Sequence, residues 1–423
     1  MVWPIVLSLG AFLLSGGAIF VFLLGLAIWI VFEKNIPLAV VQQVMFGSID
    51  KFSLLAIPYF IFAGELMARG SMAKRIINWV LAVFGRHHGS VPMATVGASS
   101  IFGAVSGSSP ATVAAVGRMM FPILRENGYS ERFSSGLVTA AGGVAIVIPP
   151  SIAMILYAAS AEQSISSLFL AGVVPGILLS ILLGLYTYVY AARRGIREGS
   201  QFKFGNVIRE TRRGFWALLM PGIVLGGIYA GIFSPTEAAG VACVYSLIVS
   251  LFIYRDLSFA DVWNIAAESC VLTGQILLLV CAAGVISWLV TTQGVPGQIA
   301  AYIEQIGLTP LTFLLVVNVL LLAVGCVLDP VSAILVLTPL LVPIADGLGI
   351  DLIHFGLIMT VNLSIGMFSP PFGLNIFVAQ ASLGVPTREI YKGVVPFLIV
   401  YVIGLMIITL IPEVSLVLLD AAK

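Results

Sequence analysis

Two proline pairs stand out because each interrupts a long apolar stretch of the chain. The first lies in AIVIPPSIAM (145–154) and the second in SIGMFSPPFGLN (364–375). Proline lacks a backbone donor and clashes with the preceding turn, so a helix must break at each pair. The carbonyl groups freed by a break, with Ser or Thr hydroxyls nearby, can coordinate a dehydrated monovalent cation. We therefore predict a cation site beside each pair; the alternative is a kink that serves packing alone.

Two other short segments carry the residues of a helix start. They are GSSPAT (107–112) and VLDPVSA (327–333). Ser108 or Ser109 in the first, and Asp329 in the second, can cap a helix whose first residue is proline. A helix start presents free N–H groups and a partial positive charge, which suit an anionic ligand. Ordinary capping explains the same residues, but an ionisable side chain inside a bilayer is costly, so Asp329 is a candidate functional residue.

The elements that position these groups are predicted to be membrane-spanning helices. The 423 residues are 60% hydrophobic and only 9% charged, with a mean hydropathy of +1.12, whereas soluble domains carry about a quarter charged residues. The first apolar run, at 2–32, has no charge before Glu33 and no basic start. This pattern predicts a retained helix and not a cleaved signal. The four cysteines lie singly in apolar segments, which indicates buried structural residues.

Apolar runs of sufficient length recur along the whole chain. The predicted helices lie near residues 3–31, 53–69, 133–158, 165–192, 215–232, 236–254, 265–290, 352–379 and 395–419. Two further apolar segments, 90–122 and 310–343, are each split by one of the tips described above. Such a segment suits a re-entrant hairpin of two half-helices better than one straight helix.

The spacing of prolines indicates an internal duplication. Four of them recur at one constant offset: Pro122, Pro149, Pro150 and Pro175 match Pro343, Pro370, Pro371 and Pro396. The letters GVVP also recur, at 172–175 and 393–396. A fixed offset of this kind predicts two structural repeats. The predicted parts are an N-terminal scaffold helix with an interfacial segment (1–52), a first repeat (53–192), a basic connector with scaffold helices (193–264) and a second repeat (265–423).

The distribution of charge predicts that the two repeats are inverted. Residues 1–213 hold 16 of the 20 Lys and Arg residues, and these flank the first hairpin and fill the connector after the first repeat. The flanks of the second hairpin carry Glu304, Asp346 and Asp351 instead. By the positive-inside rule, the first hairpin enters from the cytoplasm and the second from the opposite face. The connector is read as a topological anchor, with a lipid or partner site as the alternative.

Three acidic residues are less informative than Asp329. Glu237, in SPTEAAG, is explained by helix-start chemistry, whereas Glu65 and Glu268 fit either proton relay or helix contact.

The sequence contains no HExxH motif and no phosphate-binding GxxxxGK[ST] loop, and it has only three His residues. It also lacks a soluble stretch long enough for a nucleotide-binding domain. An enzyme or an ATP-driven pump is therefore not expected.

Taken together and in order, these motifs resemble the large membrane subunit of the tripartite ATP-independent periplasmic (TRAP) transporters. The resemblance covers nearly the whole chain and rests on GAVSGSSPATVAAVG (103–117), IPPS (148–151), SPTEAAG (234–240), the region from Asp329 to Pro343, and SPP (369–371). It implies an all-α polytopic membrane protein with two inverted repeats, each holding a re-entrant hairpin and a broken helix. It also implies an elevator-type secondary transporter in the bacterial inner membrane. The charge distribution predicts that the N-terminus is cytoplasmic and the C-terminus periplasmic.

The resemblance implies sodium-driven import of an organic acid. The expected partners are a soluble periplasmic substrate-binding protein and a small four-helix membrane subunit. The protein is expected to lie in the lipid bilayer and to bind no nucleic acid. One sodium ion would be held by Gly103, Ser106, Ala145, Ile148 and Pro150. A second would be held by Gly325, Gly366, Ser369 and Phe372. The substrate would lie between the tips, with the expected contacts Ser108, Ser109, Asp329, Thr292 and Asn375.

Three departures from the family pattern bear on these expectations. Ala145 stands where glycine is expected and Ser369 where threonine is common, but a carbonyl ligand survives either change. Thr291 and Thr292 occupy the place of an arginine expected in sialate transporters, which favours a smaller carboxylate such as a C4-dicarboxylate or a 2-oxo acid. The alternatives are a sodium–dicarboxylate carrier of the same inverted-repeat class that needs no binding protein, a channel, and a membrane enzyme.

Overall fold

The computed structural model describes residues 19–85, 87–196, 203–295, 297–298 and 307–421, and the regular elements within these ranges are all helical. Six helical segments there are long and apolar enough to cross a membrane: Phe52–Arg69, Ile165–Arg193, Pro235–Ile253, Phe259–Thr292, Pro330–Gly347 and Thr387–Leu410. Shorter apolar helices lie between them. The chain is therefore an all-helical, multi-span membrane protein, as the composition predicts.

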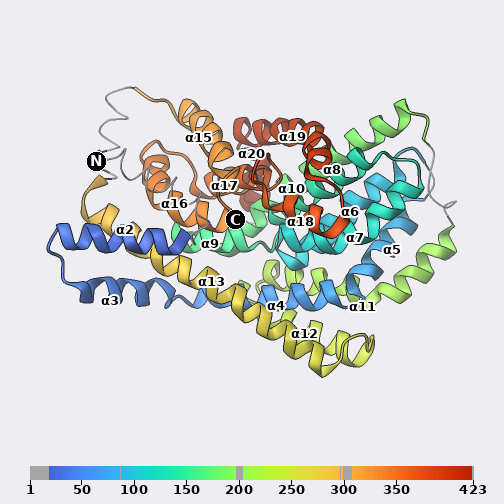
Figure 1. Ribbon diagram of the computed structural model, residues 1–423, viewed down its shortest axis with the longest axis horizontal. Helices are drawn as coiled ribbons and strands as arrows, with labels where there is room; N and C mark the ends of the chain where they lie inside the picture. The colour runs from blue at the N-terminus through green and yellow to red at the C-terminus, as the bar shows by residue number, and fades with distance from the viewer. Residues whose placement is uncertain (1–18, 86, 197–202, 296, 299–306, 422–423) are drawn as a thin grey trace.

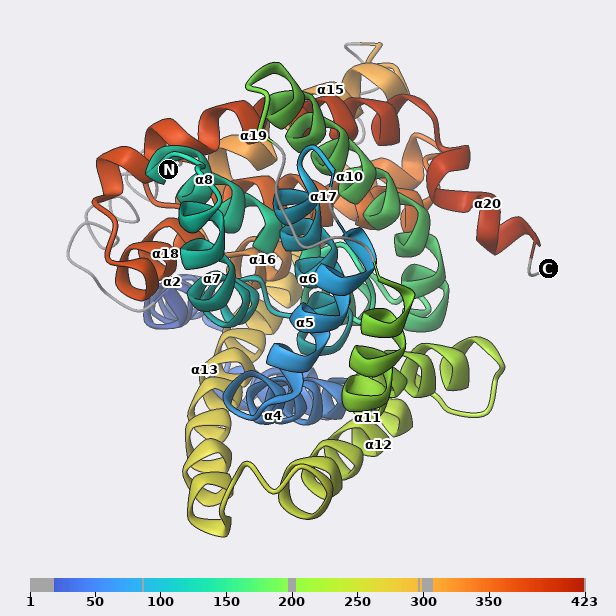
Figure 2. The ribbon, with the colours of Figure 1, turned by 90° about the vertical axis from the view of Figure 1, so that its right-hand side faces the viewer.

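One group of helices forms a support along one side of the molecule (Figures 1 and 2). Its members are α2 (Ile19–Glu33), α3 (Leu38–Ile49), α4 (Ala56–Arg69), α11 (Phe204–Tyr229), α12 (Pro235–Ile248) and α13 (Phe259–Thr292). Helices α2 and α3 pack against α13, and α4 packs between α12 and α13. In Figure 2, α4, α11, α12 and α13 lie below the remaining bundle. Helix α5 (Met72–Phe84) joins this support to the bundle, because it contacts both α11 and α6.

The bundle above the support is built from two sets of helices. The first set is α6 (Ser90–Ser106), α7 (Ser109–Glu126), α8 (Glu131–Ala141) with a 3₁₀ turn at Gly142–Ile146, α9 (Ile152–Ser160) and α10 (Ile165–Arg193). The second set is α15 (Pro310–Gly325), α16 (Pro330–Gly347), α17 (Leu352–Gly366), α18 (Leu374–Leu383), α19 (Thr387–Leu410) and α20 (Glu413–Ala421). Helices α6 and α7 form one hairpin, and α15 and α16 form the other.

The two sets follow the same spacing along the chain. Helices α7, α8, α9 and α10 begin at Ser109, Glu131, Ile152 and Ile165, and α16 to α19 begin at Pro330, Leu352, Leu374 and Thr387. The offset between matching starts is constant to within one position, and it agrees with the offset that the prolines predict. Both proline pairs interrupt a helix, between α8 and α9 and between α17 and α18, and both pairs contain a cis peptide bond.

The two sets are interleaved and do not lie side by side as separate units. Helix α18 packs against α7 and α9 packs against α16, so the second half of each broken helix contacts the hairpin of the other set. At the centre, the Ser364 hydroxyl donates to the Gly143 carbonyl at 2.7 Å. These two residues are separated by the same offset as the matching prolines. Equivalent parts of the two sets therefore meet here.

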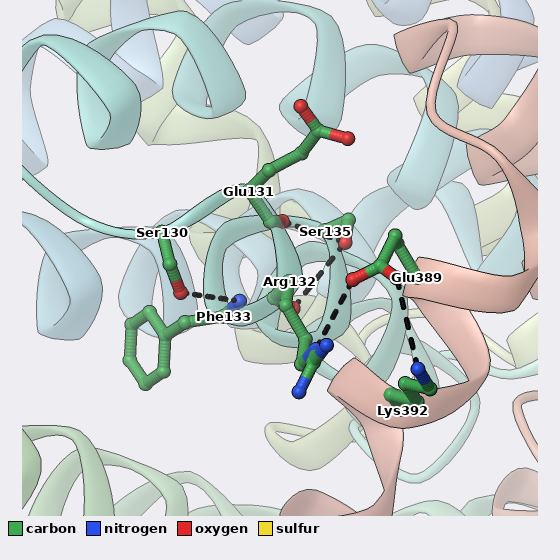
Figure 3. Close-up of polar contacts among 7 residues, drawn as sticks. All are labelled: Ser130, Glu131, Arg132, Phe133, Ser135, Glu389 and Lys392. Carbon is green, nitrogen blue, oxygen red and sulfur yellow. Dashed lines mark hydrogen bonds and ion pairs between the residues drawn. The ribbon is translucent and has the colours of Figure 1, made fainter.

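A very close contact between the sets joins α8 to α19. A Cβ atom built on Gly136 would lie 2.3 Å from the carbonyl carbon of Gly393, so the two backbones touch. Beside this contact, Arg132 of α8 pairs with Glu389 of α19 at 3.1 Å, and Lys392 approaches the same carboxylate at 3.9 Å (Figure 3). Close packing of small residues, flanked by a half-exposed ion pair, thus fastens the sets together.

Four sequence expectations about helix bounds need correction. The interfacial segment within 1–52 contains helix α3, and the flank of the first hairpin contains α5, whose residues Met72, Ile76 and Val80 are buried on one face. Both are too short to span alone, so a search for spanning runs misses them. Helix α11 begins at Phe204, inside the basic connector, and the predicted helix 395–419 is two helices, α19 and α20, separated at Pro412. Residues 3–18 of the first predicted helix lie outside the described residues.

Candidate functional site

The first tip is a tight turn between α6 and α7. Gly107 ends α6 with a φ of 57°, which favours glycine, and a Cβ there would lie 3.0 Å from the Pro150 carbonyl oxygen. Ser108 caps α7, because its hydroxyl accepts from the Ala111 N–H at 3.5 Å. The Thr112 hydroxyl donates to the Ser108 carbonyl at 2.8 Å and lies 3.2 Å from the Ser106 hydroxyl. The first tip is therefore neutral and conformationally fixed, and it touches the first proline pair.

The second tip, between α15 and α16, is longer and carries a charge. Helix α15 ends at Gly325 and α16 begins at Pro330. The Asp329 carboxylate caps α16 by accepting from the Ser332 N–H at 3.2 Å and from the Ser332 hydroxyl. Asp329 is thus a helix cap. Its carboxylate also borders the cavity described next, where it could contact a ligand.

A cavity of about 320 Å³ lies between the two tips and the support. Its walls come from both tips, from both proline-pair regions, and from α4 and α13. The polar residues that line it are Glu65, Ser106, Ser108, Ser109, Gln275 and Asp329. Three of the five residues predicted to contact substrate, Ser108, Ser109 and Asp329, therefore share one cavity, although they come from different hairpins.

The other two predicted substrate contacts lie elsewhere. Asn375 is fully buried on α18, and its amide donates to the Ser109 hydroxyl at 2.7 Å and to the Thr139 carbonyl at 3.2 Å. It therefore supports the first tip from behind the cavity wall. Thr292 ends α13, whereas the cavity is lined by α13 residues around Gln275. At 1.5 Å per residue, Thr292 lies about 25 Å further along the helix, so in this structure it is not a cavity residue.

The first predicted cation site is a close contact between α6 and the first break. A Cβ built on Gly103 would lie 2.5 Å from the Ala145 Cα atom, so only glycine fits at position 103. Together with the contact between Gly107 and Pro150, this brings the end of α6 against both sides of the break. The Ile148 side chain, in contrast, packs against Gly176 of α10. Backbone oxygens and serine hydroxyls, among them the buried Ser151 hydroxyl that has no hydrogen-bond partner within the described residues, are thus what this region can offer to a cation.

The second predicted cation site repeats this arrangement. A Cβ built on Gly366 would lie 2.5 Å from the Gly325 carbonyl carbon and oxygen, so the end of α15 touches the second break backbone to backbone. The Ser369 hydroxyl donates to the Ile365 carbonyl at 2.8 Å, and its N–H donates to the Gly366 carbonyl at 3.1 Å. The Phe372 side chain has no oxygen, nitrogen or sulfur atom, so only its backbone carbonyl could serve as a ligand.

These donor sets fit a monovalent cation held by neutral oxygens. Each carbonyl at the breaks that accepts one hydrogen bond has a second lone pair. The described residues contain no group of three or more His, Cys, Asp or Glu side chains that could hold a metal ion. The glycine contacts bring the backbone of each hairpin against the backbone of the adjacent break, where no side chain would fit between them. Hard carbonyl and hydroxyl oxygens of this kind are typical of sodium sites in transporters with broken helices.

The structure adds residues that the sequence did not assign to the site. Glu65 lines the cavity and pairs with Arg69, one turn further along α4, at 3.3 Å. Arg69 also forms a bidentate pair with Glu268 of α13, so the ion cluster ties α4 to α13 beside the cavity. The signal available in the sequence is the presence of an ionisable residue within an apolar span. Glu237 forms the predicted capping box with Ser234.

Broken helices and capped hairpins around a small central cavity define a multi-span membrane transporter. The fold is similar to that of the Alcanivorax borkumensis YdaH transporter, with a TM-score of 0.61 over 88% of each chain and 14% identity. Residues 6–414 match the family described as the tripartite ATP-independent periplasmic transporter, DctM component. The chain belongs to this family of large permease subunits, which are transporters and not enzymes.

Two relatives illustrate the range within the family. The C4-dicarboxylate TRAP transporter large permease protein DctM of Pseudomonas aeruginosa is 42% identical over 374 residues, which are 88% of each chain. The isethionate TRAP transporter permease protein DctMQ of Oleidesulfovibrio alaskensis is 38% identical over 391 residues, which are 92% of this chain and 61% of that longer protein. Family membership thus makes this chain one component of a tripartite system and leaves the substrate open.

Proposed function

We propose that the chain imports a small organic acid by sodium-coupled, elevator-type alternating access. The observation that carries this proposal is the cavity in which the starts of α7 and α16 meet α4 and α13 of the support. Both helix starts can offer N–H groups and partial positive charge to a carboxylate. The support supplies a separate wall, against which the bundle with both tips can slide.

The same proposal treats the two sets of helices as inverted repeats. Its support is the recurrence of helix starts at a nearly constant offset and the contact between Gly143 and Ser364 across the centre. Repeats of opposite orientation place their two equivalent hairpins on opposite faces of the membrane. Alternating access requires an equivalent opening on each face. The uneven distribution of Lys and Arg along the chain supports the same orientation.

Sodium, when bound, would supply a positive charge next to each tip. The residues that would hold it are those at the two breaks, where Gly103 meets Ala145 and Gly325 meets Gly366. Because the tips touch these breaks, ordering of a break also orders the helix start that faces the cavity. The carboxylate of the substrate then binds to N–H groups that are already fixed in position, and the loaded bundle moves as a unit.

The substrate is proposed to reach the cavity from a soluble periplasmic binding protein, with a small membrane subunit beside the support. The family description names a tripartite system, and the Oleidesulfovibrio relative is a DctMQ protein longer than this chain. The C4-dicarboxylate and isethionate transporters among the relatives carry small organic anions, which supports the same general substrate class here.

Uptake into proteoliposomes tests this function. The vesicles hold the chain and its small subunit, a sodium gradient is imposed, and the binding protein is added or withheld outside. Uptake that needs both sodium and the binding protein is the expected result. Uptake that needs sodium alone would instead establish a self-sufficient sodium–dicarboxylate type of carrier, and flux indifferent to sodium would overturn the cation sites.

A further inference from the structure

A second cavity, which we call the edge cavity, lies at the side of the bundle opposite the support. It has a volume of about 560 Å³ and forms where the starts of α8 and α19 meet the end of α10. In Figures 1 and 2, α8 and α19 lie on the far side of the bundle from α12 and α13. The charged side chains that line the edge cavity have no part in the proposed transport function: Glu131, Arg132, Arg194, Glu389 and Lys392.

The edge cavity carries a net positive charge when side chains and helix ends are counted together. Its three cationic and two anionic side chains leave one positive charge. The starts of α8 and α19 add about half an elementary charge each, and the end of α10 removes about half. The sum is roughly 1.5 positive charges, and every group in this count borders the edge cavity. The site therefore favours an anionic ligand.

The three cations keep N–H groups available for such a ligand. Arg132 donates to Glu389 through its Nε atom at 3.1 Å, and its two terminal nitrogens have no hydrogen-bond partner among the described residues. Lys392 lies 3.9 Å from the same carboxylate, beyond hydrogen-bond distance. The Arg194 guanidinium lies 4.5 Å from the centre of the Tyr190 ring, so its face is occupied and its edge is free. Figure 3 shows Arg132 and Lys392 sharing one carboxylate, that of Glu389.

The floor of the edge cavity is aromatic and closely packed. The rings of Phe133 and Tyr190 are stacked 4.0 Å apart, and Tyr186 meets Phe397 edge to face at 5.2 Å. Tyr186, Tyr190 and Arg194 are spaced four residues apart, so they form one stripe on the last turns of α10. Tyrosine rings that end at a cation are typical of the depth at which a membrane helix meets the lipid headgroups.

An apolar stripe leads away from the cations along α19. Val395, Ile399 and Ile403 are exposed and follow Lys392 at helical spacing, so all four lie on one face of the helix. A small soluble anion would use only the charged end of this arrangement. A ligand with a charged head and an apolar tail would use both parts, which selects a lipid over a free anion.

We infer that the edge cavity binds an anionic phospholipid, with the phosphate among Arg132, Arg194 and Lys392 and an acyl chain along the exposed stripe of α19. Arginine binds phosphate oxygens through paired N–H groups. The orientation proposed above places this end of the bundle at the cytoplasmic leaflet, whose anionic lipids attract basic groups. Because α8 and α19 belong to different sets, the lipid would hold the two sets together beside the contact between Gly136 and Gly393.

Lipid titration of the full chain with its small subunit, purified in detergent, tests the inference. The probes are dioleoylphosphatidylglycerol, which is anionic, dioleoylphosphatidylcholine, which has the same acyl chains and no net charge, and glycerol 3-phosphate, which has no acyl chain. Affinity is measured from the rise in melting temperature with probe concentration. We expect the anionic lipid to bind about tenfold more tightly than the neutral one, and glycerol 3-phosphate to cause no rise.

Two other results would overturn the inference. Equal affinity for the two lipids would mean that the cations do not select a headgroup. A rise with glycerol 3-phosphate as large as that with the anionic lipid would mean that the site takes a free phosphate group and needs no acyl chain. Neither result depends on sodium or on substrate, so the proposed transport function would stand in both cases.

Paired variants locate the preference in the edge cavity. Arg194→Gln combined with Lys392→Gln removes two of its cations, and we expect the two lipids then to bind within about twofold of each other. The control combines Arg193→Gln with Arg388→Gln, because these exposed residues lie on the same two helices and do not line the edge cavity. The control should keep the tenfold preference. An equal loss in both double variants would assign the preference to the overall charge of this face and would contradict the inference.

A single variant separates lipid binding from folding. Lys392 makes no hydrogen bond in the edge cavity, so Lys392→Gln should keep the melting temperature of the wild type without lipid. We expect it to lower the preference for the anionic lipid by about threefold. Each variant is compared with its own lipid-free melting temperature, so a less stable protein cannot imitate weaker binding. An unchanged preference in Lys392→Gln would remove Lys392 from the site and overturn the arrangement of three cations.

Discussion

The two hairpin tips occupy equivalent places but are built from different chemistry. The first is closed by two residues, a left-handed Gly107 and the neutral cap Ser108, whereas the second uses four residues and ends at the charged cap Asp329. None of the four residues 326–329 has a positive φ. The first tip is also held from outside by the bond from Asn375 to Ser109. One tip is thus fixed by conformation and packing, and the other contributes the charge.

The breaks beside the tips differ in a similar way. In the second, two glycines meet, Gly325 and Gly366, and their backbones touch. In the first, Gly103 meets Ala145, so one methyl group is accommodated between the same two elements. The first break therefore accommodates a methyl group where the second has none, and alanine at position 366 should have a larger effect than glycine at position 145.

The largest expected effect comes from Gly366→Ala. The new Cβ would lie 2.5 Å from the backbone of Gly325, which cannot rotate away. Overpacking of this kind costs about 1–3 kcal/mol of stability or more, and it separates the break from the tip. We expect a lower melting temperature and loss of sodium-driven uptake. The reverse change in the first half, Ala145→Gly, should cost about 1 kcal/mol or less and retain uptake.

A control for the alanine itself is Gly222→Ala in α11, where an added Cβ meets no atom within 4 Å. This variant should behave as wild type in both measurements. Equal tolerance of Gly366→Ala and Gly222→Ala would show that the second break opens without cost, and the proposed contrast between the two breaks would then fail.

The second largest effect is expected from Asp329→Asn. Asparagine caps a helix about as well as aspartate, so the melting temperature should change little. The variant removes one of the two charges on the cavity, and we expect sodium-driven uptake to fall by about tenfold or more. The analogous charge-neutral change at the first tip, Ser108→Thr, should leave uptake near wild type. Unchanged uptake in the Asp329 variant would contradict a role for its charge.

The sequence predicted those features that depend on local chemistry. Proline pairs must break a helix wherever they stand, and Asp329 before a proline is a cap in any fold, so both breaks and both tips could be placed. The constant offset between matching prolines placed the paired helices. What the sequence could not supply was the wall opposite the tips. Glu65 lies far from Asp329 in the sequence, and only the packing of α4 against α6, α7 and α13 brings it to the cavity.

The sequence did not predict helices that lack a proline break, a helix-start motif or an apolar run of spanning length. Helix α5 combines Lys74 and Arg75 with apolar residues and is amphipathic, so it reads as a charged flank until its buried face is seen. The resemblance places Thr292 among the substrate contacts, and in this structure it lies at the end of α13, away from the α13 residues that line the cavity. Local chemistry thus located the tips, whereas the identity of the support wall required the tertiary structure.

A smaller loss of uptake is expected when one of the hydrogen-bonded links between the two sets of helices is removed. Asn375→Ala removes the bonds from α18 to Ser109 and to the Thr139 carbonyl. Asn362→Ala is a matched variant: Asn362 is equally buried, but it bonds to Asn318 within the second set. Buried hydrogen bonds between membrane helices are worth about 0.6–2 kcal/mol, so both variants should lose similar stability. Only Asn375→Ala should weaken sodium-driven uptake; equal uptake in both variants would mean that the link is purely structural.

The smallest effect is expected for loss of the neutral cap, Ser108→Ala. The hydroxyl accepts from the Ala111 N–H at 3.5 Å, a long bond, and caps of this type contribute about 1 kcal/mol. Asp329→Ala should cost more, because its carboxylate accepts from both the N–H and the hydroxyl of Ser332. Melting temperatures of the two variants measure this difference directly. A larger fall in melting temperature for Ser108→Ala would contradict this expectation. It would mean that Gly107 and Asn375 do not hold the first tip without its cap.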